Sequence, residues 1–142
     1  MSDFLALLGR VLLSLVFVLS GYAKAMDPTG IMNNAGTKHF MEMVAGGAPA
    51  PIWLGYLIAA IELLGGIAIL IGFQTRLAAW GLVIWVIIAS YLGHPFWTME
   101  GAAHAANQAQ FLKNLAIMGG LLLLANAGAG SLSVDGRGSS NA

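Results

Sequence analysis

The chain has 142 residues, of which 58% are hydrophobic and only 8% are charged, and its mean hydropathy is +0.82. Because soluble domains carry about 25% charged residues, this composition excludes an ordinary soluble domain and predicts a single-domain integral membrane protein. Six acidic residues balance six basic ones, so we expect the lipid bilayer, and not nucleic acid, as a partner. The sequence contains no cysteine, which excludes disulfides and cysteine-bound iron–sulfur clusters within the chain.

The first apolar stretch, about 4–23, is long enough to cross a bilayer, which takes about 20 mainly apolar residues. A cleaved signal peptide is the alternative, because residues 23–25 (Ala-Lys-Ala) resemble a small-residue cleavage site. The residues before the stretch include no basic side chain, however, and the apolar run is longer than that of a signal peptide. We therefore expect a retained helix that ends at Asp27-Pro28.

Three more apolar stretches follow, at about 52–73, 77–93 and 111–127. Between the first and second spans, residues 31–44 are a candidate for a short amphipathic helix on the membrane surface or across the end of the bundle, with an irregular loop as the alternative. The sequence thus predicts an all-α four-helix membrane bundle over residues 1–142.

The connections between the spans predict how the bundle is arranged. Only Gln74-Thr75-Arg76 joins the second span to the third, so these two helices form an antiparallel hairpin. Four spans place both ends of the chain on one side of the membrane, but lysine and arginine are equally divided between the two sides and do not decide the orientation. Residues 128–142 are rich in Gly and Ser and predict a flexible tail.

Arg10 and Glu62 lie well inside predicted spans, away from their ends, and form an expected buried charge layer. Glu62 is about 15 Å into the second span, near the bilayer midplane. A charged acid there costs on the order of 2.5–3.5 kcal/mol, so Glu62 must face the bundle, lose its charge or have a partner. Arg10, about 9 Å in from the opposite face, is within reach of it. The alternatives are a structural ion pair and a carboxylate that binds a ligand or carries a proton.

Polar residues at the ends of the spans form a second group at one membrane face: Lys24, His94, Trp97, Lys113 and Asn114. A four-helix bundle brings these positions to one level. Cations, an imidazole and an amide suit an anionic or carbonyl-bearing head group, such as that of a quinone. The alternative is that lysines extend to the interface and tryptophan belongs to the interfacial belt without any ligand.

The three histidines, His39, His94 and His104, lie on this same side, but their spacing does not match a metal site. The sequence His39-x-x-Glu42 alone is weak evidence for metal ligation. We therefore expect surface histidines and no bound metal.

Four motifs, in order along nearly the whole chain, carry a family resemblance. They are Arg10…Ser20-Gly21-x-x-Lys24; Glu62-x-x-Gly65-Gly66 followed by Gly72-x-x-Thr75-Arg76; His94-Pro95-Phe96; and Asn107-Gln108 followed by Phe111-Leu112-Lys113-Asn114-Leu115. In this order and spacing, the chain resembles the DoxX family of small bacterial membrane proteins. The resemblance implies a four-helix protein of the bacterial inner membrane, with both termini cytoplasmic and the His94 side facing outward.

The resemblance also implies a redox setting, because some members are membrane subunits of a thiosulfate–quinone oxidoreductase and others anchor thiol or oxidative-stress complexes. We expect a redox-associated membrane subunit that binds quinone beside Lys24, His94 and Lys113, has no covalent cofactor and takes electrons from a protein partner. At most it is part of a quinone-linked oxidoreductase. The alternatives are a non-catalytic anchor or assembly subunit and a transporter of a small molecule or metal. The sequence specifies neither the substrate nor the oligomeric state.

Overall fold

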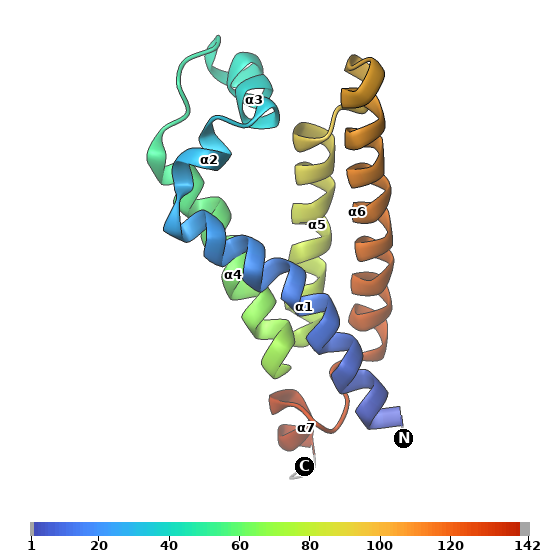
Figure 1. The fold of residues 1–142 in the computed structure, drawn as a ribbon. Coiled ribbons are helices and arrows are strands. Elements are labelled where there is room, and N and C mark those ends of the chain that lie inside the picture. The colour runs from blue at the N-terminus through green and yellow to red at the C-terminus, as the bar shows by residue number, and fades with distance from the viewer. Residues whose placement is uncertain (1, 140–142) are drawn as a thin grey trace.

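The computed structural model describes residues 2–139, and its main elements are four long helices. They are α1 (Ser2–Met26), α4 (Ile52–Ile71), α5 (Thr75–Gly93) and α6 (Gly101–Ala127). Each is long and apolar enough to cross a membrane. No strand occurs within residues 2–139, and the predicted all-α membrane bundle is confirmed (Figure 1).

The first three long helices begin and end close to the predicted spans, whereas α6 begins at Gly101 rather than at 111. The ten residues from Gly101 to Gln110 include four polar side chains, but five of the ten are alanines, and alanine has the highest intrinsic preference for the helix. The helix therefore extends beyond the apolar run. A short 3-10 turn, η1 (Phe96–Thr98), joins α5 to α6.

The predicted amphipathic segment, 31–44, corresponds mainly to α3 (Ala35–Ala45), and a further short helix, α2 (Pro28–Met32), precedes it. The side chain of Asn34 caps α3 by accepting a hydrogen bond of 2.8 Å from the Gly36 N–H. Both helices lie at the end of the bundle opposite the two chain ends (Figure 1).

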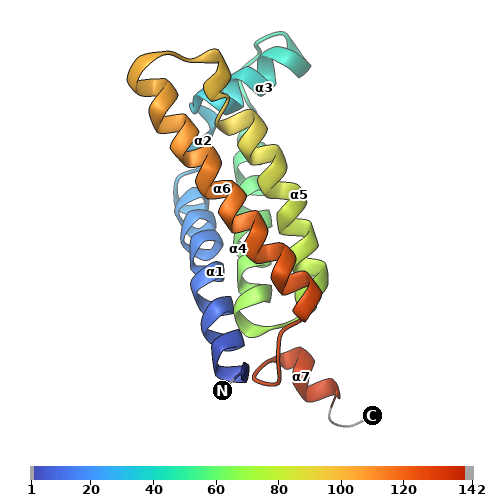
Figure 2. The same cartoon turned by 90° about the vertical axis from the view of Figure 1, so that its right-hand side faces the viewer.

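The four long helices do not pack uniformly. Helix α1 lies along α4, and α5 lies along α6. The two pairs meet near the chain-end side of the bundle, where a buried apolar cluster fills the interior. They move apart toward α3, which spans the opening between them (Figure 1); Figure 2 gives the same bundle turned by 90°. The core cluster consists of Phe17, Ile69, Ala79, Leu82, Val83, Val86, Leu121 and Ala125.

The segment after α6, for which the composition predicts a flexible tail, contains a short helix and contacts the bundle. Residues 128–139 turn back under the bundle and form α7 (Val134–Ser139), while the last residues of the predicted tail, 140–142, lie outside the described part of the chain. The carboxylate of Asp135 accepts hydrogen bonds from the backbone N–H groups of Gln74 (2.8 Å) and Thr75 (2.9 Å). This interaction caps α5, because the Gln74 side chain makes no capping bond.

The capping carboxylate has a perturbed acidity. Burial alone would raise the pKa of Asp135, but the hydrogen bonds from Thr75 and Gln74 and the nearby Arg10 cation outweigh burial and lower it. The start of α1 and helix α7 lie on the same side of the bundle (Figure 1), as an even number of spans requires.

Candidate functional site

A cavity of about 310 Å³ lies where the two helix pairs separate, beneath α3. Its walls are mainly apolar side chains of α1, α4 and α5, and α3 contributes Gly36, Thr37 and Phe40 at its outer end. Such a volume, with apolar walls and few polar groups, is typical of a small-molecule site. The polar residues that line it from the four long helices and the end of α5 are Lys24, Glu62, Trp85, His94 and Asn114, and Asn34 and Thr37 line it from the α3 side.

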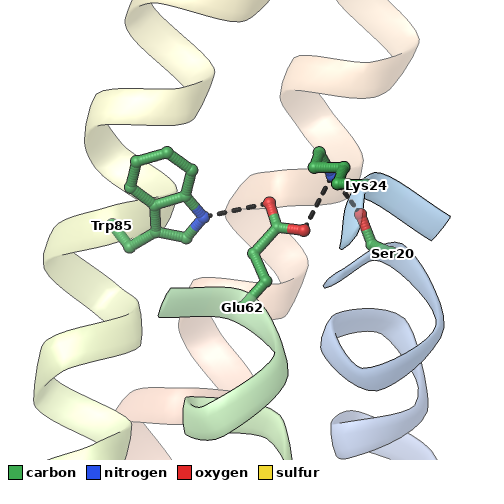
Figure 3. A network of polar contacts seen from close by, with 4 residues as sticks. All are labelled: Ser20, Lys24, Glu62 and Trp85. Carbon is green, nitrogen blue, oxygen red and sulfur yellow. Dashed lines mark hydrogen bonds and ion pairs between the residues drawn. The ribbon is translucent and has the colours of Figure 1, made fainter. Parts of the chain in front are cut away.

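Glu62 is the central residue of a polar network that joins three helices (Figure 3). Its Oε2 lies 2.7 Å from the Nζ of Lys24 on α1, and its Oε1 accepts a hydrogen bond of 3.2 Å from the Trp85 indole N–H on α5. Lys24 Nζ also donates to Ser20 Oγ, one turn earlier on α1. The Glu62 residue is only 7% exposed. Both carboxylate oxygens therefore have donors, as a buried carboxylate requires.

A close approach of α1 to α4 brings this network together. A Cβ atom added to Gly21 would lie 2.5 Å from the Leu63 backbone nitrogen, so only glycine permits this spacing. Gly21 directly follows Ser20, and Leu63 directly follows Glu62. The contact between the two backbones therefore places the α1 donors beside the α4 carboxylate.

The predicted pair between Arg10 and Glu62 is not formed, and Lys24 is the partner of Glu62 instead. On one helix, Arg10 and Lys24 are about 21 Å apart, and the α1–α4 packing places Lys24 at the level of Glu62. Arg10 is fully buried near the chain ends and donates to the carbonyl oxygen of Leu132. It lies against Gly72, at the turn between α4 and α5, so it binds the C-terminal segment to the bundle.

His94, at the C-terminal end of α5, and Asn114, in the middle of α6, line the same cavity from the other helix pair. The Nδ1 atom of His94 lies 3.1 Å from Oδ1 of Asn107 on α6. The amide of Asn114 donates a hydrogen bond of 3.0 Å to Ser90 Oγ on α5. These contacts hold both side chains in fixed orientations across the α5–α6 interface.

Comparison with known proteins identifies the family. The sequence model of the DoxX family matches residues 5–95. The chain is 33% identical over 133 residues to "Inner membrane protein YphA" of Escherichia coli (strain K12), which covers 94% of this chain and 89% of that protein. It is 35% identical over 135 residues to "Inner membrane protein YqjF" of the same strain, with 95% and 92% covered. The chain belongs to the DoxX family.

The match to the DoxX family contains the whole Ser20–Lys24–Glu62–Trp85 network, whereas Asn114 lies beyond it. This DoxX-family chain is also 31% identical over 80 residues to "ER-derived vesicles protein ERV29" of Saccharomyces cerevisiae, covering 56% of this chain and 26% of that protein. No solved structure matches the chain. The bacterial relatives and the four apolar helices identify a multi-pass protein of the bacterial inner membrane.

The structure separates the predicted ligand-binding residues into two sets. Lys24, His94 and Asn114 line the cavity, together with Glu62 from the predicted charge layer. Lys113 is exposed and donates to the Gln110 side chain.

Trp97, the remaining predicted ligand-binding residue, is 48% exposed. It belongs to an aromatic cluster outside the cavity, which also contains Tyr91, Phe96 and Phe111.

Sequence reasoning missed Trp85. Its signal was a tryptophan in the middle of a span, away from the interfacial belts where this residue is normally enriched.

In the described part of the chain, no three His, Cys, Asp or Glu side chains gather closely enough to hold an ion. Within its apolar walls the cavity offers an ammonium group, a carboxylate, an imidazole, an indole N–H, a hydroxyl and the amides of Asn34 and Asn114. Such groups can orient a small polar head and exchange protons with it.

Proposed function

We propose that this DoxX-family chain is a redox-associated membrane subunit that binds a quinone head group in the cavity between the two helix pairs. The observation that carries the proposal is the Lys24–Glu62–Trp85 network, which borders an apolar cavity inside the bundle. The ammonium group has three hydrogens, and Ser20 and Glu62 accept two of them. The third hydrogen of Lys24 is available to a carbonyl oxygen of the ligand.

The apolar walls of the cavity suit the ring and the isoprenoid tail of a quinone. Apolar side chains from three spans supply contacts for the ring and for the start of an isoprenoid tail. Reduction of a quinone to a hydroquinone takes two electrons and two protons. His94 and Glu62 are the groups that exchange protons with solvent or ligand in this proposal.

The electrons come from a protein partner in this proposal. The chain has no cysteine, and an electron-donating subunit would carry the redox centre. We place both termini in the cytoplasm and the His94 end of the cavity toward the outer face, as the family resemblance implies. Cysteine-scanning with a membrane-impermeant thiol reagent tests this orientation, because the chain has no thiol of its own. Labelling of a cysteine introduced into α3 from outside supports it, and labelling only after membrane disruption contradicts it.

Quinone binding by the purified chain in lipid nanodiscs tests the site, with a short-tailed ubiquinone as the ligand and calorimetry as the measurement. The structure provides matched controls, since Lys113 and Trp97 lie at the predicted level but not in the cavity. We expect Lys24→Met to weaken binding by about tenfold or more, as expected for a lost hydrogen bond from a charged donor. Lys113→Met should change the affinity by less than about twofold.

The tryptophan pair gives a second comparison. Trp85→Phe keeps an aromatic side chain but removes the N–H that holds Glu62, so it should weaken binding more than Trp97→Phe does. Binding that is equal in all four variants would place the site elsewhere. Absence of binding by the unaltered chain, together with a stable partner recovered from native membranes, would favour a non-catalytic anchor.

A further inference from the structure

We infer that the cavity recognises the reduced, hydroxyl-bearing form of its ligand, a hydroquinone, in preference to the quinone, because Lys24 on its α1 side donates hydrogen bonds while His94 and Asn114 on its α5–α6 side accept them. The inference rests on the proposed function, whose ligand it specifies. It depends on which hydrogens the polar side chains of α5 and α6 carry, and the hydrogen-bond partners determine this.

The tautomer of His94 follows from its neighbours. Asn107 donates a hydrogen bond of 3.0 Å from Nδ2 to the Ala103 carbonyl oxygen. A carbonyl oxygen only accepts, so the NH₂ end of the Asn107 amide faces Ala103 and the Oδ1 end faces His94. Since Oδ1 also only accepts, the nitrogen of His94 at 3.1 Å from it must carry the hydrogen. In the neutral imidazole, Nε2 then has a lone pair and no hydrogen.

Asn114 is oriented by the same kind of reasoning. The hydroxyl of Ser90 has one hydrogen, which it donates to the Val86 carbonyl oxygen at 2.6 Å. Ser90 Oγ therefore accepts from the Asn114 NH₂ group at 3.0 Å. The Oδ1 atom of Asn114 is the end of this amide that remains for the cavity. Asn107 and Ser90 are thus positioning residues, and they leave two acceptors, His94 Nε2 and Asn114 Oδ1, on the α5–α6 side of the cavity.

The oxidised and reduced forms of the ligand differ in the hydrogen bonds that they can make with these donors and acceptors. Both oxygens of a quinone only accept, so one of them is satisfied by Lys24 and the other faces His94 and Asn114 with no hydrogen between. A hydroquinone hydroxyl both accepts and donates, so it accepts from Lys24 at one end and donates to the imidazole or amide at the other. A site built to hydrogen-bond a hydroxyl discriminates against an analogue that lacks the hydrogen.

The expected preference for the reduced form is about tenfold or more, the effect of a single hydrogen bond. For a two-electron couple, a tenfold preference raises the midpoint potential of the bound quinone by about 30 mV. The site would therefore favour transfer of electrons from a partner to the quinone.

The first test measures the tautomer without any ligand. Nitrogen-15 NMR of the histidine-labelled full chain in nanodiscs, assigned with His94→Gln, distinguishes a protonated Nδ1 from a protonated Nε2 at a pH where the ring is neutral. We expect Nδ1 to be protonated. Asn107→Leu should abolish this preference and Asn107→Asp, which keeps an acceptor, should retain it. The neighbouring exposed Gln108→Leu should change nothing. A merely structural role of Asn107 would not move this signature, and a protonated Nε2 in the unaltered chain overturns the inference.

The second test compares affinities for a short-tailed ubiquinone and its hydroquinone under anaerobic conditions. We expect the hydroquinone to bind about tenfold more tightly, and Asn114→Leu to reduce that ratio, whereas the exposed Gln108→Leu should leave the ratio unchanged. Binding of both forms with equal affinity, or tighter binding of the quinone, refutes the preference but leaves the proposed function intact. Binding of neither form refutes both. The two failures are therefore distinguishable.

Discussion

Replacing Lys24 by methionine removes the cation that balances Glu62 and leaves a carboxylate inside the bundle. The side chains of Lys24 and Glu62 are 21% and 10% exposed, so water screens the pair only weakly. Removing one partner of a buried ion pair costs about 3–5 kcal/mol. The remaining hydrogen bond from Trp85 and the partial exposure of Lys24 reduce this cost, and we expect the free energy of unfolding to fall by about 2–3 kcal/mol.

The assay is equilibrium unfolding in mixed micelles, with the helical signal in circular dichroism as the measurement. Lys113→Met is the matched control, because this lysine is exposed, and it should change the free energy of unfolding by no more than about 0.5 kcal/mol. Glu62→Gln leaves Lys24 without its carboxylate partner. The double variant Lys24→Met with Glu62→Gln removes both charges and should recover most of the loss, giving a coupling energy of at least about 1 kcal/mol.

Two results would refute the reasoning. If Lys24→Met is no more destabilising than Lys113→Met, the pair does not contribute to the folded state. If the double variant equals the sum of the two single variants, Lys24 and Glu62 are not coupled, and the network in Figure 3 does not describe how the membrane-embedded carboxylate is held.

Three more predictions concern the contact between α1 and α4 and the Asp135 cap of α5. Gly21→Ala should lower the free energy of unfolding by about 1–3 kcal/mol, because the added Cβ would lie 2.5 Å from the Leu63 nitrogen. The control is Gly9→Ala on the same helix, whose added Cβ meets nothing within 4 Å; it should leave the free energy of unfolding unchanged or raise it by up to about 1 kcal/mol. Equal effects of the two substitutions in the same unfolding assay would contradict this prediction. Asp135→Ala should reduce the hydrogen-exchange protection of the turn between α4 and α5, whereas Asp3→Ala should leave it unchanged. Because the pKa of Asp135 is lowered on folding, its stabilising effect is complete above the ordinary carboxyl pKa of about 3.9 and is lost as the pH falls through the lower folded value. If the hydrogen-exchange protection of the turn, corrected for intrinsic exchange, does not weaken in that acidic range, this pH dependence is refuted.

The candidate site was only partly predictable, and α6 illustrates why. The sequence places Lys113 and Asn114 at one membrane level, because level depends on how far each residue lies along its helix. Adjacent residues nevertheless point about 100° apart around a helix of 3.6 residues per turn. Asn114 faces the cavity and Lys113 does not, since the packing of α6 on α5 sets the rotation. The sequence pattern contains no direct signal for that rotation, as α6 has apolar residues around most of its circumference.

The C-terminal segment shows a second limit of composition. Its Gly- and Ser-rich sequence predicts flexibility, but Asp135 lies where the uncapped end of α5 needs an acceptor. Arg10, buried in the first span, donates to the Leu132 carbonyl of the same segment. These contacts join residues 60 or more positions apart in the sequence, so no local pattern predicts them.

By itself, the sequence determined that the chain has four membrane spans, because the length and hydropathy of each span are local properties of the sequence, and the bilayer thickness sets the length required. It also determined that an acid near the bilayer midplane must have a partner. Only the tertiary structure decided which partner. The backbone contact at Gly21 and Leu63 brings Lys24 to Glu62 and leaves Arg10 to the C-terminal segment, because the choice between two cations on one helix depends on where the neighbouring helix crosses it.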